Sequence, residues 1–513
     1  MKTRLFRTFL VLMVLLVAIV PTALADNGTD SSALRAAVTV AGVRAHQKAF
    51  QSFAKADGGT RVAGFPGHDD SAKYVFGLLD AAGYNVSYQP FEYDFFQEIT
   101  PGVLEQTFPG TVTYTNGVDF FTMSYSGNGN VTATVQAVDF VLPPAGGSTS
   151  GCEPSDFDTF VSGNIALLSR GTCTFRMKAE NAYAAGAVGV IIFNEGNTPA
   201  REPLFGGTLS PPTFNIPVMS ASFAFGTALN DLIDDGLELH MVTDTFSAVL
   251  TTNNVIAETP TGRTDRVVVV GAHLDSVPEG PGINDNGSGS GAILEIALQM
   301  AALNIQPRNQ VRFIWFSAEE AGLLGSDFYV SQLTKNQIRD IAVMLNFDMV
   351  GSPNYVRFVY DGDGSGTGTV GPNGSDVVED VFLDYFGPTP TEPTAFDGRS
   401  DYGPFIDVGI PAGGLFTGAE GLKTAAQVTT YGGIAGAQYD PCYHLACDTF
   451  KGTGSGAGST PPGLGLIALD QMSDAAAHAV LTFAMTTSAV NGTDKGQGGG
   501  QSDFEYLGSS LKK

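Results

Sequence analysis

Apolar and polar positions repeat with a helical period in the first part of the chain, over residues 33–84. The spacing is clearest over residues 70–79, and Gly83 follows as a residue that favours the end of a helix. The next stretch, residues 85–91, alternates between polar and apolar side chains, which is typical of a strand. The chain is therefore predicted to begin with helices and to turn to strand at Asn85.

The pattern changes again near residues 110 and 250. Between these points, short β-rich runs are broken by Pro and Gly, and one segment predicts a helix near residues 175–187. After Thr252, buried-strand runs alternate with helical segments. The strands are expected at 267–271, 311–316 and 341–347, and the helices at 291–303, 324–333 and 469–486. This alternation predicts a three-layer α/β domain.

The two changes predict that one domain is inserted into another. Residues 26–115 and 250–490 are expected to join as the two parts of the α/β domain, around a β-rich domain at 116–249. The last residues, 491–513, are polar and rich in Gly, and we expect them to form a flexible tail. The length of 513 residues also favours more than one domain.

The first 25 residues have the pattern of a secretory signal peptide. A basic start is followed by an apolar run at residues 10–20 and by a small-residue cleavage pattern that ends at Ala25. An uncleaved N-terminal anchor is the alternative, although the apolar run is short for a bilayer. We expect cleavage after Ala25 and a secreted protein with no membrane segment.

The composition excludes several classes of protein. Apolar residues make up 43% of the chain, which is too many for a wholly disordered protein. The 26 Lys and Arg residues against 52 Asp and Glu residues give a net charge of −26. Such a surface repels phosphate backbones and anionic lipids, so we expect neither nucleic acid nor a membrane as a partner.

The four cysteines can form disulfides in three pairings. The local pairing, Cys152 with Cys173 and Cys442 with Cys447, is favoured because each loop is short and each pair lies in its own segment. A cysteine metal site is the alternative. An oxidising destination and the lack of a second nearby cysteine pair favour disulfides.

The first candidate functional residues follow the apolar run at 267–271. His273 and Asp275 are two positions apart at the end of this predicted strand, so both side chains lie on one face. Asp275 could then accept a hydrogen bond from the second ring nitrogen of a metal-binding His273. Asp285 follows in a Gly-rich loop and could bridge two cations with its two oxygens. Strand ends of this kind are where α/β proteins bind ligands.

Two more strands are followed by acidic residues. Glu319 and Glu320 follow residues 311–316, and neighbouring side chains on non-helical backbone point in different directions. One of them could bind a metal while the other acts as the general base for a metal-bound water. The residues alone do not say which is which. Asp348 ends the run at 341–347.

The last candidate segment is the turn between Cys442 and Cys447. A disulfide there would make the turn that presents Tyr443 and His444 rigid. Isolated acidic or histidine residues are usually solvated surface groups, but five candidate ligands in such settings favour a metal site. These ligands are His273, Asp285, Glu320, Asp348 and His444.

These segments closely resemble peptidase family M28, whose members are co-catalytic zinc aminopeptidases. The segments are Gly271-Ala-His-Leu-Asp-Ser-Val, Gly282-Ile-Asn-Asp-Asn-Gly, Ser317-Ala-Glu-Glu-Ala-Gly and Asp440-Pro-Cys-Tyr-His. The similarity is nearest to the secreted Streptomyces-type and yeast vacuolar aminopeptidase Y branches, and it covers about residues 40–490. It implies a three-layer αβα zinc-exopeptidase fold with a mixed central sheet.

The resemblance also implies a role for each candidate. One zinc ion would be bound by His273, Asp285 and Asp348, and a second by Asp285, Glu320 and His444. It implies that Glu319 is the general base, that Asp275 orients His273, that Tyr443 donates to the tetrahedral intermediate and that Arg399 contacts substrate. Histidine and carboxylate ligands suit zinc.

The inserted region has a resemblance of its own, to a protease-associated (PA) domain. The residues that carry it are Gly151-Cys-Glu-Pro-Ser-Asp-Phe, Gly163-Asn-Ile-Ala-Leu-Leu-Ser-Arg-Gly-Thr-Cys and Asn181-Ala-Tyr-Ala-Ala-Gly-Ala-Val-Gly-Val. It lacks clustered acid and base residues, which argues against separate catalysis. A passive lid or spacer and a substrate-binding module are equally good interpretations.

The whole pattern predicts a monomeric aminopeptidase that acts on peptide N-termini. An M28-type carboxypeptidase and a catalytically silent binding protein on the same fold are the alternatives. One further motif, Asp361-Gly-Asp363-Gly, resembles the start of a calcium loop. The remaining ligands at the spacing of an EF-hand are missing, so no EF-hand is predicted.

Overall fold

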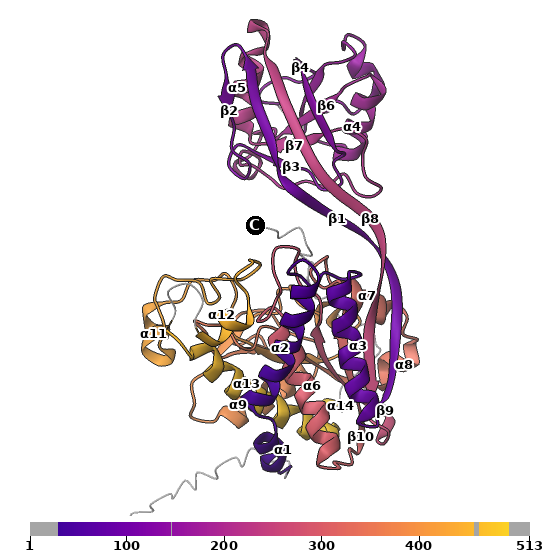
Figure 1. The fold of residues 1–513 in the computed structure, drawn as a ribbon, viewed down its shortest axis with the longest axis vertical. Helices are drawn as coiled ribbons and strands as arrows, with labels where there is room; N and C mark the ends of the chain where they lie inside the picture. The colour runs from indigo at the N-terminus through magenta and orange to yellow at the C-terminus, as the bar shows by residue number, and fades with distance from the viewer. Residues whose placement is uncertain (1–28, 145, 456–460, 492–513) are drawn as a thin grey trace, which may run out of the picture.

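The computed structural model describes residues 29–144, 146–455 and 461–491. A large lobe and a small lobe are joined by two long strands, β1 (Asn85–Phe108) and β8 (Glu238–Glu258) (Figure 1). The expected signal peptide, residues 1–25, lies outside the described residues, as does the expected tail after Asn491.

One mixed sheet runs through the large lobe, in the order β13-β12-β14-β11-β9-β10-β8-β1. The bounds of its other strands are β9 Arg263–His273, β10 Asn309–Phe316, β11 Ile341–Phe347, β12 Phe358–Tyr360, β13 Glu392–Thr394 and β14 Ala412–Phe416. Strand β9 is parallel to both β10 and β11, and β11 is parallel to β14, so the carboxyl ends of these strands meet at one edge of the sheet. The three strands predicted after Thr252 correspond to β9, β10 and β11.

Alternate residues of the central strands form two separate cores. Val268 and Val270 of β9 pack into the larger core, and Val267 and Val269 pack into the other. Helices that contribute to the larger core are α1 (Ser32–Ala37), α2 (Val40–Ala56), α3 (Pro66–Ala81), α6 (Gly287–Ala302), α9 (Ser375–Phe386) and α13 (Leu464–Met485). The opposite face is covered by α7 (Leu324–Ser331), α8 (Lys335–Asp340) and α10 (Gly403–Asp407). The fold class expected from the sequence, a three-layer αβα domain, is confirmed.

The first three helices belong to the large lobe. Helix α2 packs on α3 and on α6, and α1 packs on α13. More than 200 residues separate α2 from α6 in the sequence. Leu34, Val43 and Phe50 are fully buried in this contact region. Hydrophobic burial therefore holds the start of the described chain against its end (Figure 1).

The two connecting strands are longer than the sequence pattern predicts. The alternation at 85–91 marks only the beginning of β1, which pairs antiparallel with β8 from Asn85–Glu258 to Phe108–Glu238, with three irregularities. In the large lobe β8 also pairs with β10, and in the small lobe it pairs with β4. Strand β8 therefore runs through the boundary expected near residue 250, whereas β1 ends at Phe108, before the boundary expected near residue 115. A partner strand, and not local alternation, sets their length.

The small lobe continues the sheet in the order β8-β4-β5-β6-β7-β3. The bounds are β2 Val112–Thr113, β3 Phe120–Thr122, β4 Gly129–Ala137, β5 Ile165–Ser169, β6 Gly189–Phe193 and β7 Val218–Ala221, with helices α4 (Phe175–Ala184) and α5 (Phe223–Asp231). Alternate residues of β5 again enter two apolar cores, Ile165 and Leu167 on one side and Ala166 and Leu168 on the other. The helix predicted near residues 175–187 is α4.

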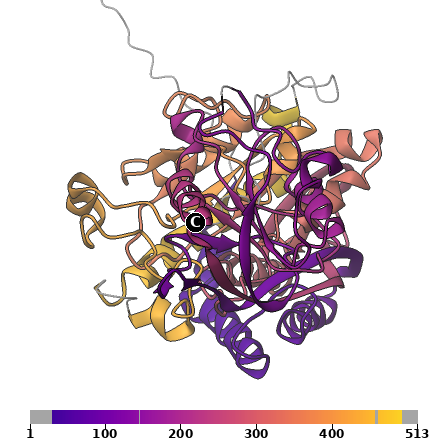
Figure 2. The same cartoon turned by 90° about the horizontal axis from the view of Figure 1, so that it is seen from above.

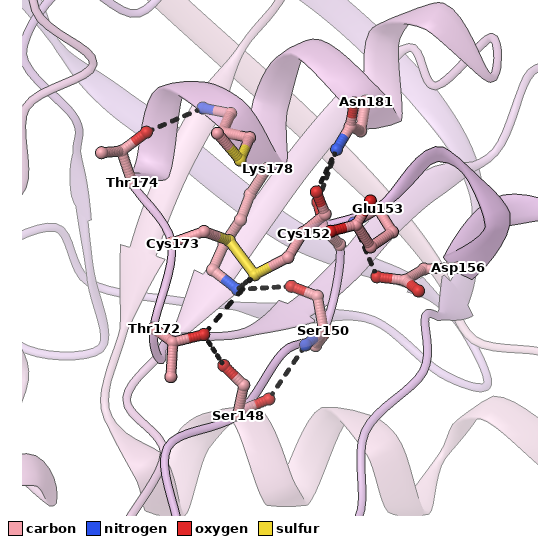
Figure 3. The surroundings of a disulfide bond; sticks show 12 residues. Ser148, Ser150, Cys152, Glu153, Asp156, Thr172, Cys173, Thr174, Lys178 and Asn181 are labelled. Carbon is pink, nitrogen blue, oxygen red and sulfur yellow. Dashed lines mark hydrogen bonds between the residues drawn. A yellow bond between two sulfur atoms is a disulfide. The ribbon is translucent and has the colours of Figure 1, made fainter.

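Both local disulfides are present, Cys152–Cys173 in the small lobe and Cys442–Cys447 in the large lobe. Figure 3 shows the first of them beside helix α4. The Lys178 ammonium on α4 donates to the carbonyl oxygen of Ser150 and lies 3.7 Å from the Cys152 sulfur. The disulfide thus forms part of a buried polar cluster.

The carboxyl edge of the central strands faces the small lobe. Strand β8 enters the large lobe from the small lobe, and β10 runs antiparallel to it, so β9, β10 and β11 all point toward the small lobe. In a view from above, the small lobe lies in front of the large lobe (Figure 2). Among the described helices, none combines the length and the apolar character needed to cross a membrane.

Candidate metal centre

Three neighbouring parallel strands bring the predicted ligands together. His273 is the last residue of β9, Asp348 follows β11 directly, and Glu319 and Glu320 lie three and four positions after Phe316, the last residue of β10. Their register places Phe316 opposite His273. The parallel pairing therefore gathers side chains from three separate segments at one edge of the sheet.

Asp285 lies between the two histidines. Its Oδ1 is 3.2 Å from Nε2 of His273, and its Oδ2 is 3.3 Å from Nε2 of His444. The carboxylate precedes α6, whose first residue is Gly287. Each oxygen of Asp285 thus faces a different imidazole, as a carboxylate that bridges two cations requires.

The remaining carboxylates divide between the two histidines. Oδ1 of Asp348 is 3.4 Å from Nε2 of His273, and Oε2 of Glu319 is 3.8 Å from the same nitrogen. Oε2 of Glu320 is 3.1 Å from Nε2 of His444. Candidate ligand atoms lie within 4.8 Å of one another in two groups, His273 with Glu319 and Asp348, and His273 with Asp285 and Glu320.

These residues fit a metal ion because several of their buried polar atoms have no hydrogen-bond partner. The atoms include Oε1 of Glu320 and Oδ1 of Asp348. Buried polar groups are normally hydrogen-bonded, so an unpartnered carboxylate oxygen at a cluster of ligands indicates a cation-binding site. Imidazole and carboxylate together are a ligand set that zinc accepts.

The charges of the cluster point the same way. Burial by itself lowers the pKa of His273, but the carboxylates of Glu319 and Asp348 raise it well above its ordinary value. Burial likewise lowers the pKa of His444, and Glu320 and Asp285 raise it to about 11. Burial raises the pKa of Glu319 well above its ordinary value, and the nearby carboxylates of Glu320 and Asp348 add to this. So many acidic groups in one buried space need positive charge for balance.

The contacts of Asp275 differ from the expected ones. Its Oδ1 is 3.6 Å from Nδ1 of His273, which is too long for a hydrogen bond. The two carboxylate oxygens instead accept from the backbone N–H groups of Glu319 and Glu320, at 3.2 and 3.3 Å. Asp275 therefore fixes the backbone that carries both glutamates.

A disulfide-closed turn presents the residues on the far side of the cluster. The phenol ring of Tyr443 stacks on the imidazole of His444, with 3.8 Å between ring centres. Nη2 of Arg399 donates to the Tyr443 hydroxyl at 3.1 Å, and its Nη1 donates to Glu420 at 2.6 Å. Arg399, which the family resemblance assigns to substrate contact, thus touches the turn that carries His444.

Two buried residues that the sequence patterns did not single out support the cluster. The Arg61 guanidinium, on the segment between α2 and α3, donates to the carbonyl oxygens of Leu274, Pro281 and Gly282. Arg61 is fully buried, and burial lowers its pKa to about 10 while nearby carboxylates, first among them Asp275, oppose the decrease. Arg61 thus connects the end of β9 to the loop that carries Asp285.

The second supporting residue is Asp448, directly after Cys447. Its carboxylate accepts from the backbone N–H groups of Asn284 and Asp285, at 2.7 and 3.0 Å. The turn that presents His444 and the loop that presents Asp285 are therefore held together. Asp448 directly follows Cys447, so its position beside the predicted disulfide was the sequence signal that could have identified it. No local feature of the sequence marks Arg61.

Backbone strain is concentrated around the cluster. Ala318, Met349 and His444 all have positive φ values, of 55°, 49° and 56°. Residues other than glycine rarely adopt this conformation, and where they do they often lie at functional sites. Each of the three is a ligand candidate or the neighbour of one.

A cavity of about 610 Å³ opens beside the cluster. Its polar end includes Asp285, Glu319, Glu320, Asp348 and His444, together with Arg399 and Tyr443. Further polar residues, among them Glu279, Asp397 and Glu420, also line the cavity, and its apolar side chains are those of Val277, Leu323, Met349, Phe358, Tyr360, Phe416 and Tyr439. An apolar pocket that ends at charged groups is the usual form of a small-molecule or peptide-end site.

The sequence models of two known families match this chain. That of peptidase family M28 matches residues 254–457, and that of the PA domain matches residues 131–229. A protein of Pseudomonas aeruginosa named aminopeptidase is 50% identical over 401 residues, which cover 78% of this chain and 74% of that protein. The chain belongs to peptidase family M28. A PA domain is inserted in this M28 peptidase.

Other relatives agree. Leucine aminopeptidase 2 of Trichophyton equinum is 40% identical over 404 residues, which cover 77% of this chain and 76% of that protein. The predictions of the family and of a metallo-aminopeptidase are confirmed by these matches.

Solved structures also resemble this M28 peptidase. An aminopeptidase from Aneurinibacillus sp. strain AM-1 has a TM-score of 0.61 and 25% identity, covering 88% of this chain and 95% of its own. A zinc aminopeptidase from Bacillus subtilis has a TM-score of 0.54 and 26% identity, covering 86% and 94%. The family thus implies zinc as the metal.

Proposed function

We propose that this M28 peptidase is secreted, binds two zinc ions and releases N-terminal residues from peptides. The observation that carries the proposal is the place of Asp285, with one carboxylate oxygen facing His273 and the other facing His444. One cation would be held by His273, Asp285 and Asp348, and the other by Asp285, Glu320 and His444. When bound, the pair of zinc ions supplies an activated water and polarises the carbonyl group of the substrate.

Glu319 is the residue proposed to move the proton. It lies 3.8 Å from Nε2 of His273 but makes no close contact with His444, so it can remain free of the ligand set. Its carboxylate would accept a proton from the attacking water and donate it to the leaving amine. Asp275 keeps Glu319 in place through the backbone N–H group.

Tyr443 and Arg399 are proposed to contact the substrate. Burial raises the pKa of the Tyr443 phenol far above its ordinary value, so the hydroxyl keeps its proton and can donate a hydrogen bond to an oxyanion. Arg399 and Tyr443 both line the cavity and are hydrogen-bonded to each other. Arg399 would thereby orient Tyr443 as well as bind substrate.

The cavity favours an apolar N-terminal side chain. Much of its lining is aliphatic and aromatic, including Met349, Phe358 and Phe416. The free amino group of a peptide would lie near the carboxylates, where a positive charge is favoured. Two relatives of this chain carry the name leucine aminopeptidase 2, which agrees with such a preference.

The proposed organisation follows the sequence-based division. Residues 1–25 would be the signal peptide, 26–115 and 250–490 the peptidase domain, 116–249 the PA domain and 491–513 a tail. The packing of α2 on α6 and the presence of disulfides support an α/β domain in two parts and an oxidising compartment. We further propose a monomer.

Free-amine and N-acetylated peptides, assayed side by side, test the activity. Release of the first residue from the free peptide alone is the expected result. Release only from the C-terminus of the blocked peptide would support the carboxypeptidase alternative, and no release from either would support a silent binding protein. Leucine and glutamate at the first position then test the apolar pocket, with leucine expected to be preferred.

Two matched variants test the roles of the neighbouring glutamates. Glu319→Gln is expected to keep both zinc ions and to lose about 10²–10⁴-fold in kcat, the usual effect of removing a general base. Glu320→Gln is expected to bind less zinc, because it removes a ligand. Metal counting on the purified proteins decides between them. Full zinc in Glu320→Gln with depleted zinc in Glu319→Gln would reverse the two assignments.

A further inference from the structure

A second acidic cluster lies outside the metal centre, where strand β12 ends. Asp361 follows Tyr360 directly, Asp363 lies two residues further in a Gly-rich loop, and Glu379 projects from helix α9. One ligand atom from each of these three residues lies within 4.8 Å of those of the other two. The Asp361-Gly-Asp363-Gly loop does not have the ligand spacing of an EF-hand, but helix α9 places a third carboxylate beside it.

One carboxylate oxygen in this cluster has no partner. Oδ2 of Asp361 accepts from the backbone N–H groups of Gly366 and Thr367, at 3.0 and 2.6 Å, and from the Thr367 hydroxyl at 2.7 Å. Oδ1 of the same side chain has no hydrogen bond with any of the described residues, and Asp361 is fully buried. Because Oδ2 is already satisfied by the loop, Oδ1 is the atom left for the cluster. A buried, unpartnered carboxylate oxygen beside two more carboxylates requires a ligand.

The cluster also lacks a counter-charge. Among the described residues, no lysine, arginine or histidine forms an ion pair with any of the three carboxylates. The contacts they do make are hydrogen bonds from uncharged N–H and O–H groups, for example from the N–H of Gly362 to Glu379 at 2.8 Å and from the N–H of Ser365 to Asp363 at 2.8 Å. Three carboxylates this close together repel one another. A bound cation would relieve this repulsion.

We propose that Asp361, Asp363 and Glu379 bind one calcium ion. All the available donors are hard oxygens, and neither histidine nor cysteine is present in the group, which disfavours zinc. Calcium accepts six to eight oxygen ligands in a flexible geometry, so backbone carbonyl groups and water can complete the shell. Magnesium requires a near-ideal octahedron, which two loop residues and one helix residue are less suited to provide.

The site has a structural consequence for the substrate cavity. Phe358 and Tyr360, both on β12, line that cavity, and β12 lies near the edge of the sheet between β13 and β14. A calcium ion would connect the end of β12 to helix α9 and so hold this wall in place. The inference does not rest on the proposed peptidase activity, since calcium binding is measured directly.

Calcium binding to the zinc-loaded protein in metal-free buffer, without chelators, tests the proposal. Asp363→Asn and Glu379→Gln are each expected to bind one calcium ion fewer than the parent protein and to show a smaller calcium-dependent rise in Tm. Asp384→Asn is the matched control, because it removes an exposed carboxylate from the same helix. It is expected to behave like the parent protein.

The zinc content of all four proteins is measured in the same samples and should not change. Circular dichroism of each variant, without calcium, shows that it is folded. Equal calcium stoichiometry in the parent and in both folded variants would overturn the proposal. Equally strong displacement of calcium by magnesium would overturn the choice of metal.

Discussion

Both lobes of this M28 peptidase contain a fully buried long cationic side chain, for example Arg61 in the large lobe and Lys178 in the PA lobe. Arg61 donates to three backbone carbonyl groups that flank His273 and Asp285, and its positive charge faces the carboxylates of the metal centre. Lys178 donates to the carbonyl of Ser150 and contacts the Cys152 sulfur, with no carboxylate in an ion pair (Figure 3).

The difference shows how the two lobes use buried charge. In the large lobe, the buried cation is one part of a network that connects separate segments and ends at the ligand cluster. In the PA lobe, the buried cation holds one helix, α4, against a disulfide and a loop. Three predictions test this difference between the two lobes.

The largest effect is expected from removing the two cations in turn. Arg61→Met leaves three buried carbonyl groups without their donor and frees the loop that carries Asp285. We expect about 10–100-fold losses in zinc affinity and in kcat/KM, as for other residues that position metal ligands. Lys178→Met, in contrast, is expected to leave both quantities within about twofold.

Zinc titration and kinetics on both variants check this contrast. Arg61→Lys serves as the conservative control and is expected to restore only part of the activity, because one ammonium cannot reproduce the fork of a guanidinium. Unchanged zinc affinity in folded Arg61→Met would show that Arg61 is only a structural residue.

Removal of the small-lobe disulfide should cost more stability, and removal of the large-lobe disulfide should cost more zinc binding and activity. The Cys152–Cys173 bond closes a sequence separation of 21 residues and the Cys442–Cys447 bond a separation of 5, so loop entropy predicts losses of about 3 and about 2 kcal/mol when each is removed. Replacing Cys442 and Cys447 by alanine should nevertheless reduce zinc binding more, because His444 lies in that turn.

Separate probes are available for the two lobes. Trp315, the single tryptophan, lies in β10, so its fluorescence reports unfolding of the large lobe. Hydrogen exchange of amides in β5 and β6 reports the PA lobe. If the Cys152, Cys173 double variant lost zinc and the Cys442, Cys447 double variant lost none, the predicted difference between the two disulfides would be wrong.

The third prediction concerns pH. Burial lowers the pKa of Lys178 from 10.5 to about 8. Between these values the unfolded chain carries a proton that the folded chain lacks, so the free energy of unfolding of the PA lobe should rise as the pH increases from about 8 to 10.5. Hydrogen exchange at several pH values measures this slope. Lys178→Met should lack it, and a slope that survives the substitution would assign the effect to another group.

Much of the fold and the core of the candidate site could be predicted from the sequence. Local patterns are sufficient for elements such as β9, β10 and β11, because a buried strand needs a continuous apolar run. The ligand candidates follow these runs directly, and parallel strands must bring their ends to one edge. The three-layer class followed from such signals, whereas the family and the PA domain followed from the resemblance of particular segments to known families.

Other features depend on contacts between distant segments. The bonds of Arg61 to Pro281 and Gly282 span 220 and 221 residues, and Glu379 reaches Asp363 from a helix 16 residues away in the chain. The Asp275 carboxylate accepts hydrogen bonds from the backbone N–H groups of Glu319 and Glu320, in the loop after β10. The spacing of Asp275 from His273 in the sequence did not indicate these partners.

The sequence by itself determined where the central strands β9, β10 and β11 lie and which turns carry histidine, carboxylate and cysteine, because periodicity and turn chemistry act over a few residues. Only the tertiary structure decided how β1 and β8 span both lobes, which groups Asp275 and Arg61 bind, and where Asp361 finds a third carboxylate. These features arise when separately formed layers pack together. Their partners are then fixed by the shape and charge of the packed surfaces, which no short stretch of sequence contains.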